Sequence, residues 1–98
     1  MYARMVIGEA ISEEQVREFA NIYLSDVLPK LKDEPGFESA RLMVEEGGRM
    51  AVSLTIWETR DDCLNYHSSR CYRQFVSQTQ HLLAGDFVVK LFKDWGSG

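Results

Sequence analysis

The chain has 98 residues, of which 45% are apolar, and it carries a formal charge of −4 at pH 7. This length suits one domain with a single core. The acidic balance argues against a nucleic-acid partner, because binding to phosphates depends on clustered lysine and arginine. No run of about 18 apolar residues and no secretory signal pattern occurs, so we expect a cytoplasmic protein with no membrane association.

The first half of the chain predicts a strand and then a long helix. Residues Tyr2 to Gly8 are apolar and of strand length, and Ser12 with Gln15 forms a helix-start signal. The residues that follow repeat at period 3.6, which predicts a helix with one buried face. That face contains Val16, Phe19, Ala20, Tyr23, Leu24, Val27, Leu28 and Leu31.

Two prolines modify this helix. Pro29 lies inside the apolar stripe and lacks a backbone N–H, which predicts a kink near Val27. The helix should stop at Glu34-Pro35-Gly36, because a residue before proline avoids the helical region and glycine accepts a positive φ.

A β-hairpin follows. Two strand-length runs, Phe37 to Glu45 and Arg49 to Trp57, are joined by Glu46-Gly47-Gly48. The second run alternates two sets of residues that are both largely apolar or small, so neither face of this strand should be fully solvated. The sets are Met50, Val52, Leu54 and Ile56 on one face, and Ala51, Ser53, Thr55 and Trp57 on the other.

The last part of the chain predicts an interrupted helix and a final strand. Thr59 can cap the helix, Ser68-Ser69 interrupts it, and a strand is expected over Asp86 to Trp95. The order of elements is then βαββαβ. This order predicts an α+β, ferredoxin-like domain over residues 1–95, with a four-stranded antiparallel sheet and the helices on one face. Residues 96–98 are expected to form a flexible tail of the kind that an expression tag leaves.

The other face of this sheet needs a cover. Residues such as Val88 and Phe92, or the apolar set around Val52, would otherwise leave a patch larger than monomers usually expose. A second copy of the chain is the simplest cover, because two-fold homodimers are the commonest symmetric assemblies. We therefore expect a homodimer through the sheet faces.

Several short motifs resemble the antibiotic biosynthesis monooxygenase domain family. They are Ala3-Arg4, Leu28-Pro29-Lys30-Leu31 leading into Pro35-Gly36-Phe37, Ile56-Trp57-Glu58-Thr59, and the interrupted helix through Tyr72. The resemblance spans roughly Tyr2 to Trp95. It implies a dimeric α+β barrel, with a pocket between sheet and helices, and oxygenation of a small aromatic, quinol or polyketide-like phenol without a cofactor.

The resemblance does not extend to every activity of that family. Haem-degrading members carry asparagine, tryptophan and histidine where this chain aligns Ala3, Tyr66 and Val76. Quinol-oxidising members carry histidine where it aligns Tyr66 and Cys71. The resemblance thus favours a pocket more strongly than a particular mechanism.

Oxygenation without metal or flavin needs a base that removes a proton from an electron-rich substrate in a dry pocket. His67 is the natural candidate by its intrinsic pKa, and Tyr66 beside it is the second predicted catalytic residue. The alternative for His67, a half-exposed residue at a helix end, stays open.

The remaining aromatic residues are candidates for binding a small apolar or aromatic ligand. Tyr72, Tyr23, Phe75 and Trp57 could line the pocket, although Tyr23 and Phe75 also fit core positions of their helices. Trp57 equally fits the corner where strand turns into helix.

Cys71 is also placed among the substrate-binding candidates. It follows a helix start and lies beside Arg70, which can lower the pKa of a thiol, but a pair with His67 depends on the spacing across the Ser68-Ser69 break. Cys63 and Cys71 are expected to be reduced, and the acidic pair near Thr59 has no third ligand, so no metal site is predicted. A non-catalytic dimeric module that binds a small ligand is the alternative function.

Overall fold

The computed structural model describes residues 1–96; Ser97 and Gly98, which belong to the predicted tail, lie outside the described residues. The strands are β1 (Tyr2–Glu9), β2 (Phe37–Val44), β3 (Met50–Trp57) and β4 (Val88–Lys93). The helices are α1 (Glu13–Ile22), η1 (Tyr23–Val27), α2 (Leu28–Leu31), α3 (Arg60–His67), α4 (Arg70–Thr79) and η2 (Gln80–Leu82).

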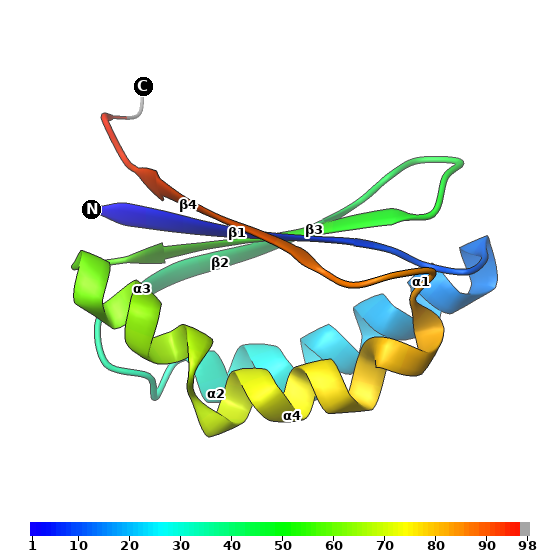
Figure 1. Ribbon diagram of the computed structural model, residues 1–98, viewed down its shortest axis with the longest axis horizontal. Coiled ribbons are helices and arrows are strands. Elements are labelled where there is room, and N and C mark those ends of the chain that lie inside the picture. The colour runs from blue at the N-terminus through cyan, green and yellow to red at the C-terminus, as the bar shows by residue number, and fades with distance from the viewer. Residues whose placement is uncertain (97–98) are drawn as a thin grey trace.

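The four strands form one antiparallel sheet in the order β2-β3-β1-β4. All helices lie on one side of this sheet, and the other side carries none (Figure 1). The predicted α+β, ferredoxin-like βαββαβ fold is confirmed. Among residues 1–96, no helix is both long and apolar enough to cross a membrane.

Pro29 changes the long helix in a way that the period of 3.6 does not predict. The helix widens into the π-helical segment η1 just before Pro29, and the N–H of Leu28 bonds to the carbonyl of Tyr23, five residues back. This widening accommodates the ring of Pro29 inside a continuous helical path. On this segment Tyr23 and Val27 are buried as the stripe predicts, whereas Leu24, also predicted on the stripe, is 53% exposed.

The Pro35-Gly36-Phe37 and Trp57-Glu58-Thr59 motifs lie side by side. The N–H of Glu58 donates to the carbonyl of Gly36 at 2.8 Å, and the rings of Phe37 and Trp57 meet edge to face at 5.6 Å. Gly36 has a φ of 79°, and the side chain of Asp62 fills the space where a Cβ would lie. The same Asp62 donates its N–H to the Thr59 hydroxyl, which caps α3 as predicted. This junction fixes where α3 leaves the sheet.

The edge strand β4 is shorter than the predicted run Asp86 to Trp95. It pairs only with β1, and the pairing runs from Val88 opposite Ile7 to Lys93 opposite Tyr2, where β1 begins. Trp95 lies beyond this pairing and is 90% exposed.

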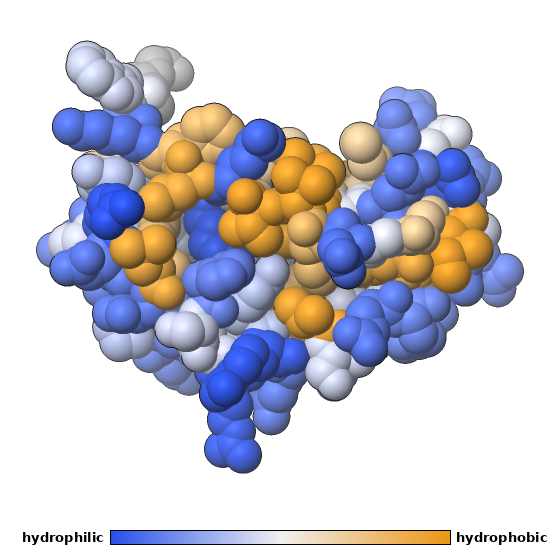
Figure 2. All heavy atoms as spheres, in the orientation of Figure 1, coloured by the Kyte–Doolittle hydropathy of each residue, from blue (hydrophilic) through white to orange (hydrophobic). Residues whose placement is uncertain are grey.

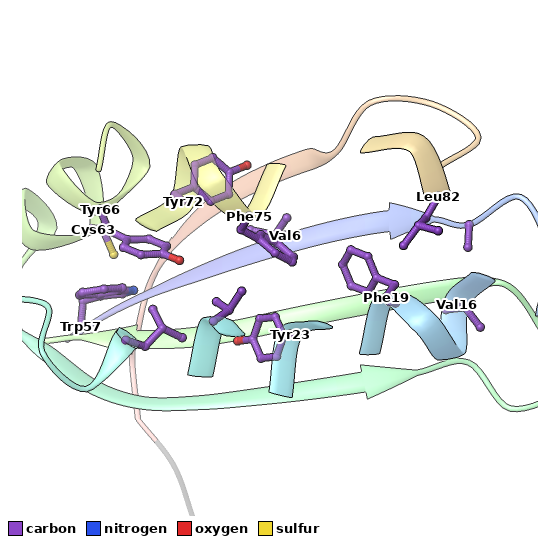
Figure 3. Close-up of a cluster of buried hydrophobic side chains, with 14 residues drawn as sticks. Val6, Val16, Phe19, Tyr23, Trp57, Cys63, Tyr66, Tyr72, Phe75 and Leu82 are labelled. Carbon is purple, nitrogen blue, oxygen red and sulfur yellow. The ribbon is translucent and has the colours of Figure 1, made fainter. Parts of the chain in front are cut away.

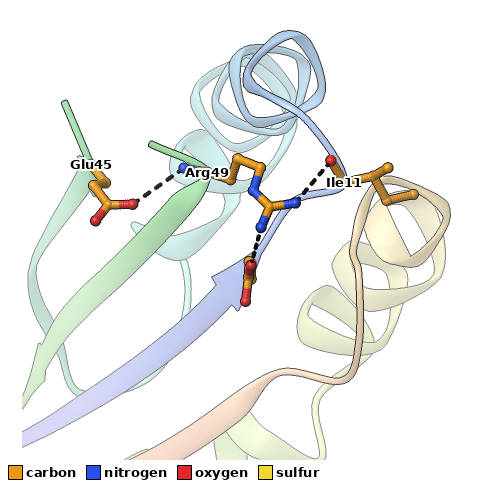
Figure 4. Close-up of polar contacts among 4 residues, drawn as sticks. Ile11, Glu45 and Arg49 are labelled. Atoms are coloured by element: carbon orange, nitrogen blue, oxygen red, sulfur yellow. Dashed lines mark hydrogen bonds and ion pairs between the residues drawn. The ribbon is translucent and has the colours of Figure 1, made fainter. Parts of the chain in front are cut away.

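Arg49 holds the hairpin turn against the connection between β1 and α1 (Figure 4). Its guanidinium donates to the carboxylate of Glu9 at 2.8 Å and to the carbonyl of Ile11 at 3.2 Å, and its backbone N–H donates to Glu45. The ion pair is half exposed, so we expect it to contribute at most about 1 kcal/mol to stability.

The two faces of the sheet differ sharply. The face under the helices buries one alternating set of β3, namely Ala51, Ser53, Thr55 and Trp57. The opposite face, called here the outer face, carries the other set together with its cross-strand neighbours. Its apolar residues are Ala3, Met5, Ile7, Met43, Met50, Val52, Leu54, Ile56, Val88 and Phe92. The two apolar groups predicted as alternatives therefore lie on one face, and Val88 and Phe92 are 50% and 44% exposed.

Candidate functional site

Three aromatic side chains form a cluster where α3 and α4 meet the sheet (Figure 3). Trp57 at the end of β3 is fully buried and stacks on Tyr66 of α3 with ring centroids 4.9 Å apart. Tyr66 in turn contacts Tyr72 of α4 at 5.7 Å. The Ser68-Ser69 break makes this possible, because α3 ends at His67 and α4 begins at Arg70 with Ser69 as its cap.

Arg4 of β1 lies against this aromatic cluster. Its side chain is only 3% exposed, and its guanidinium lies over the ring of Tyr72 at 4.2 Å and over Tyr66 at 5.1 Å. Both distances suit cation–π attraction. Within residues 1–96 no carboxylate lies within 4.0 Å of Arg4, so its charge has no ionic partner there.

The hydrogen bond from Arg4 fixes the protonation of His67. A guanidinium nitrogen of Arg4 lies 2.9 Å from Nδ1 of His67. Arginine stays protonated and can only donate, so Nδ1 accepts and a neutral ring carries its proton on Nε2. Desolvation, followed by the charge of Arg4, lowers the pKa of His67 below its ordinary value. At neutral pH His67 is therefore a neutral imidazole with its single proton on Nε2.

A groove opens beside these two residues, between α3 and β4. Its volume is about 360 Å³, and it is lined by Arg4, Cys63, Leu64, His67, Val89 and Leu91. Figure 2 shows apolar side chains on both sides of this recess, over α3 and over β4. The groove thus combines apolar walls with one cation and one imidazole, as small-molecule sites commonly do.

A second hollow of about 320 Å³ lies between α1 and the hairpin turn. Its charged lining residues, Glu13, Arg17 and Glu45, are all exposed. We place the candidate site at the α3–β4 groove, because there a buried cation, Arg4, lines the cavity.

Neither cysteine has the surroundings of an activated thiol. Burial raises the pKa of Cys71, whereas its position near a helix start had suggested a lowered one. Its sulfur lies 4.0 Å from the hydroxyl of Tyr66, and within residues 1–96 no hydrogen bond joins it to His67. Burial likewise raises the pKa of Cys63, and both thiols are free, as expected.

The structure brings together some of the predicted site residues and separates others. His67 and Arg4 line the groove, and the rings of Tyr66 and Tyr72 contact Arg4. Tyr23 and Phe75 lie deeper in the core, where their rings contact each other at 5.7 Å and the Tyr23 hydroxyl bonds to Ser53 at 2.8 Å. Trp57 and Cys71 also do not border the groove.

Arg4 is the residue that sequence reasoning missed. The sequence indicates Arg4 only as part of a family motif, although the alternation of side chains along β1 also indicates that Arg4 is buried. Arg4 is two residues from Val6, so both side chains point to the same face of the strand. An arginine on the same strand face as core residues is an exception to the rule that buried positions are apolar, and such exceptions are informative.

Among residues 1–96, no three histidine, cysteine or acidic side chains come together as metal ligands. The structure therefore adds no candidate metal centre to the groove.

The family model for antibiotic biosynthesis monooxygenase matches residues 4–78. No curated protein sequence matches the chain. The solved structures give matches in fold. The monooxygenase from the gene ActVA-Orf6 of Streptomyces coelicolor, in complex with nanaomycin D, is 16% identical with a TM-score of 0.85, over 98% of this chain and 88% of that one.

Two further structures support the same fold. SnoaB, a cofactor-independent oxygenase from Streptomyces nogalater, is 13% identical with a TM-score of 0.80, over 98% of this chain and 94% of that one. Rv0793 from Mycobacterium tuberculosis is 17% identical with a TM-score of 0.79, over 98% and 96% of the two chains.

Proposed function

Because the chain belongs to the antibiotic biosynthesis monooxygenase family, we propose that it oxidises a small aromatic, quinol or polyketide-like phenol with dioxygen, without a metal or flavin. The observation that supports this best is the α3–β4 groove, in which a neutral imidazole faces a space with apolar walls. Two structural relatives, described as a monooxygenase and a cofactor-independent oxygenase, agree with the proposal.

His67 is the proposed base. Its lowered pKa keeps the ring neutral at neutral pH, and Nδ1 holds the basic lone pair of that ring. Nδ1 accepts the proton of a substrate hydroxyl when this hydroxyl takes the place of the Arg4 guanidinium at Nδ1. The resulting electron-rich anion can pass an electron to dioxygen. For an anthrone-type substrate, the ring CH₂ becomes a carbonyl by losing four electrons; one oxygen atom enters the product, and the other leaves as water with the two hydrogens.

Tyr66 and Tyr72 are proposed to act as positioning residues, because their rings hold the guanidinium that bonds to His67. None of the other predicted binding residues, Tyr23, Trp57, Cys71 and Phe75, borders the groove, and their contact with a substrate stays a prediction.

Oxygen uptake tests the function. With anthrone and 1,4-naphthalenediol as substrates, we expect uptake above the rate in buffer. His67→Ala should lower this rate by about 10²-fold or more, the usual contribution of a general base. His81→Ala is the matched control, because His81 is exposed on η2 and lies outside the groove. Uptake no faster than in buffer for both substrates, or an unchanged rate in His67→Ala, would contradict the proposal.

The alternative is a non-catalytic module that binds a small apolar or aromatic ligand. The groove is open to solvent and His67 is exposed, and both observations favour this alternative. This module would show thermal stabilisation by a ligand that is recovered unchanged, because binding to the folded state alone raises apparent stability.

A homodimer through the outer face is the proposed assembly. Helices cover only one side of the sheet (Figure 1). The other side carries the apolar residues of the outer face together with Glu9, Arg41 and Lys90. Two such faces packed together would remove this apolar surface from water and form a closed two-layer structure.

A further inference from the structure

We propose that Arg4 recognises an anionic oxygen on an aromatic ligand, a carboxylate or a phenolate, at the floor of the α3–β4 groove. This inference rests on the proposed function and deepens it, because it states the ionic form in which the ligand binds.

The first observation is the unpaired charge of Arg4. Its side chain is 3% exposed, and it contacts two aromatic rings and a neutral imidazole. A buried charge is costly unless it is paired, and cation–π contacts offset only part of that cost. An anion arriving through the groove would complete the pairing that the fold leaves open within residues 1–96.

The second observation is that Arg4 has donors to spare. A guanidinium carries five N–H donors, and the hydrogen bond to His67 uses one of them. No fully buried side-chain nitrogen in residues 1–96 lacks a partner, so the unused donors of Arg4 border accessible space. Arg4 itself lines the groove, and that is where this space lies.

The third observation selects an aromatic anion over a small inorganic one. Leu64, Val89 and Leu91 line the groove, and each is more than a third exposed. An aromatic ring would cover these apolar side chains while its oxygen reaches the guanidinium. A bare phosphate would leave them in water.

The titratable groups that face Arg4 in the groove do not compete for this role. On α3 they are His67, which is neutral, and Cys63, whose pKa is raised by burial. From β4 the groove is lined by Val89 and Leu91, which carry no charge. The positive charge at the floor is therefore available to a ligand at neutral pH.

Binding of 1-naphthoate and its neutral analogue 1-naphthamide tests the proposal without turnover. By calorimetry, the wild-type protein should bind naphthoate about tenfold or more tightly than naphthamide, as a charge-assisted hydrogen bond implies. Arg4→Met should abolish this preference, whereas Arg73→Met, which removes one positive charge from the exposed face of α4, should retain it.

A second experiment, with a phenol, distinguishes recognition of a phenolate from recognition of a carboxylate. The visible absorption of 4-nitrophenol reports its ionisation, and an adjacent cation should lower the apparent pKa of the bound phenol by about one unit or more. A lowered pKa together with a naphthoate preference assigns both anions to Arg4. A naphthoate preference alone assigns the carboxylate.

Equal affinity for naphthoate and naphthamide in the wild-type protein, with no change in the pKa of nitrophenol, would overturn the inference even if Arg4→Met fails to fold. A preference that persists in a folded Arg4→Met would overturn it as well. Because neither probe needs oxygen, a failure here is distinguishable from the absence of oxygenase activity.

Discussion

Replacing Trp57 with alanine is expected to lower the free energy of unfolding by about 3–5 kcal/mol, the usual cost of removing a large buried aromatic side chain. Trp57 is fully buried, stacks on Tyr66, meets Phe37 edge to face and donates from Nε1 to Thr55 at 2.9 Å. The substitution removes all of these contacts at the point where β3 turns into α3. Because domains of this size have only about 5–15 kcal/mol of stability, the effect should be plain in urea or thermal unfolding.

The matched control is Trp95→Ala. Trp95 is 90% exposed, so its loss should change stability by no more than about 0.5 kcal/mol. Equal losses for the two tryptophans would contradict the packing described at the junction.

Replacing Val52 with glutamate is expected to convert a dimer into a monomer. Val52 lies at the centre of the outer face, with Ile7 and Met43 as its cross-strand partners. A carboxylate there is solvated in a monomer, but a dimer would bury it among apolar side chains without a partner. Light scattering at micromolar concentration should therefore give twice the 11.3 kDa chain mass for the wild-type protein and a single chain mass for Val52→Glu.

Leu24→Glu is the control, because Leu24 is 53% exposed on η1, in the helical layer. This variant should remain dimeric. A wild-type protein that scatters as a soluble 11.3 kDa particle would contradict the proposed assembly.

The sequence predicted the fold well where local chemistry and hydrophobic period agree. Ser12 and Thr59 cap α1 and α3 as their positions indicated, and the serine pair breaks the helix before α4. The alternation of β3 separated the two sheet faces correctly, since one set is buried under the helices. These signals depend on neighbours within a few residues, which sequence alone displays.

Other features depend on distant parts of the chain and could not be predicted in the same way. The end of β4 is set by where β1 begins, and Leu24 on the widened turn before Pro29 is exposed although the apolar period predicted it on the buried face. The groove combines β1, α3 and β4, so no single motif indicates it. His67 was identified by its chemistry, but its partner Arg4 lies 63 residues away in sequence.

The most direct test of the central claim, that the α3–β4 groove is the functional site, is to fill the groove and measure oxygen uptake together with naphthoate binding. Leu64 lines the groove and is 44% exposed, so Leu64→Trp adds bulk there with little effect on the core. Leu24→Trp adds the same bulk to the helical layer outside the groove. We predict that Leu64→Trp loses both oxygen uptake and naphthoate binding by about tenfold or more while Leu24→Trp retains both. Unchanged uptake and binding in a folded Leu64→Trp protein would contradict the account.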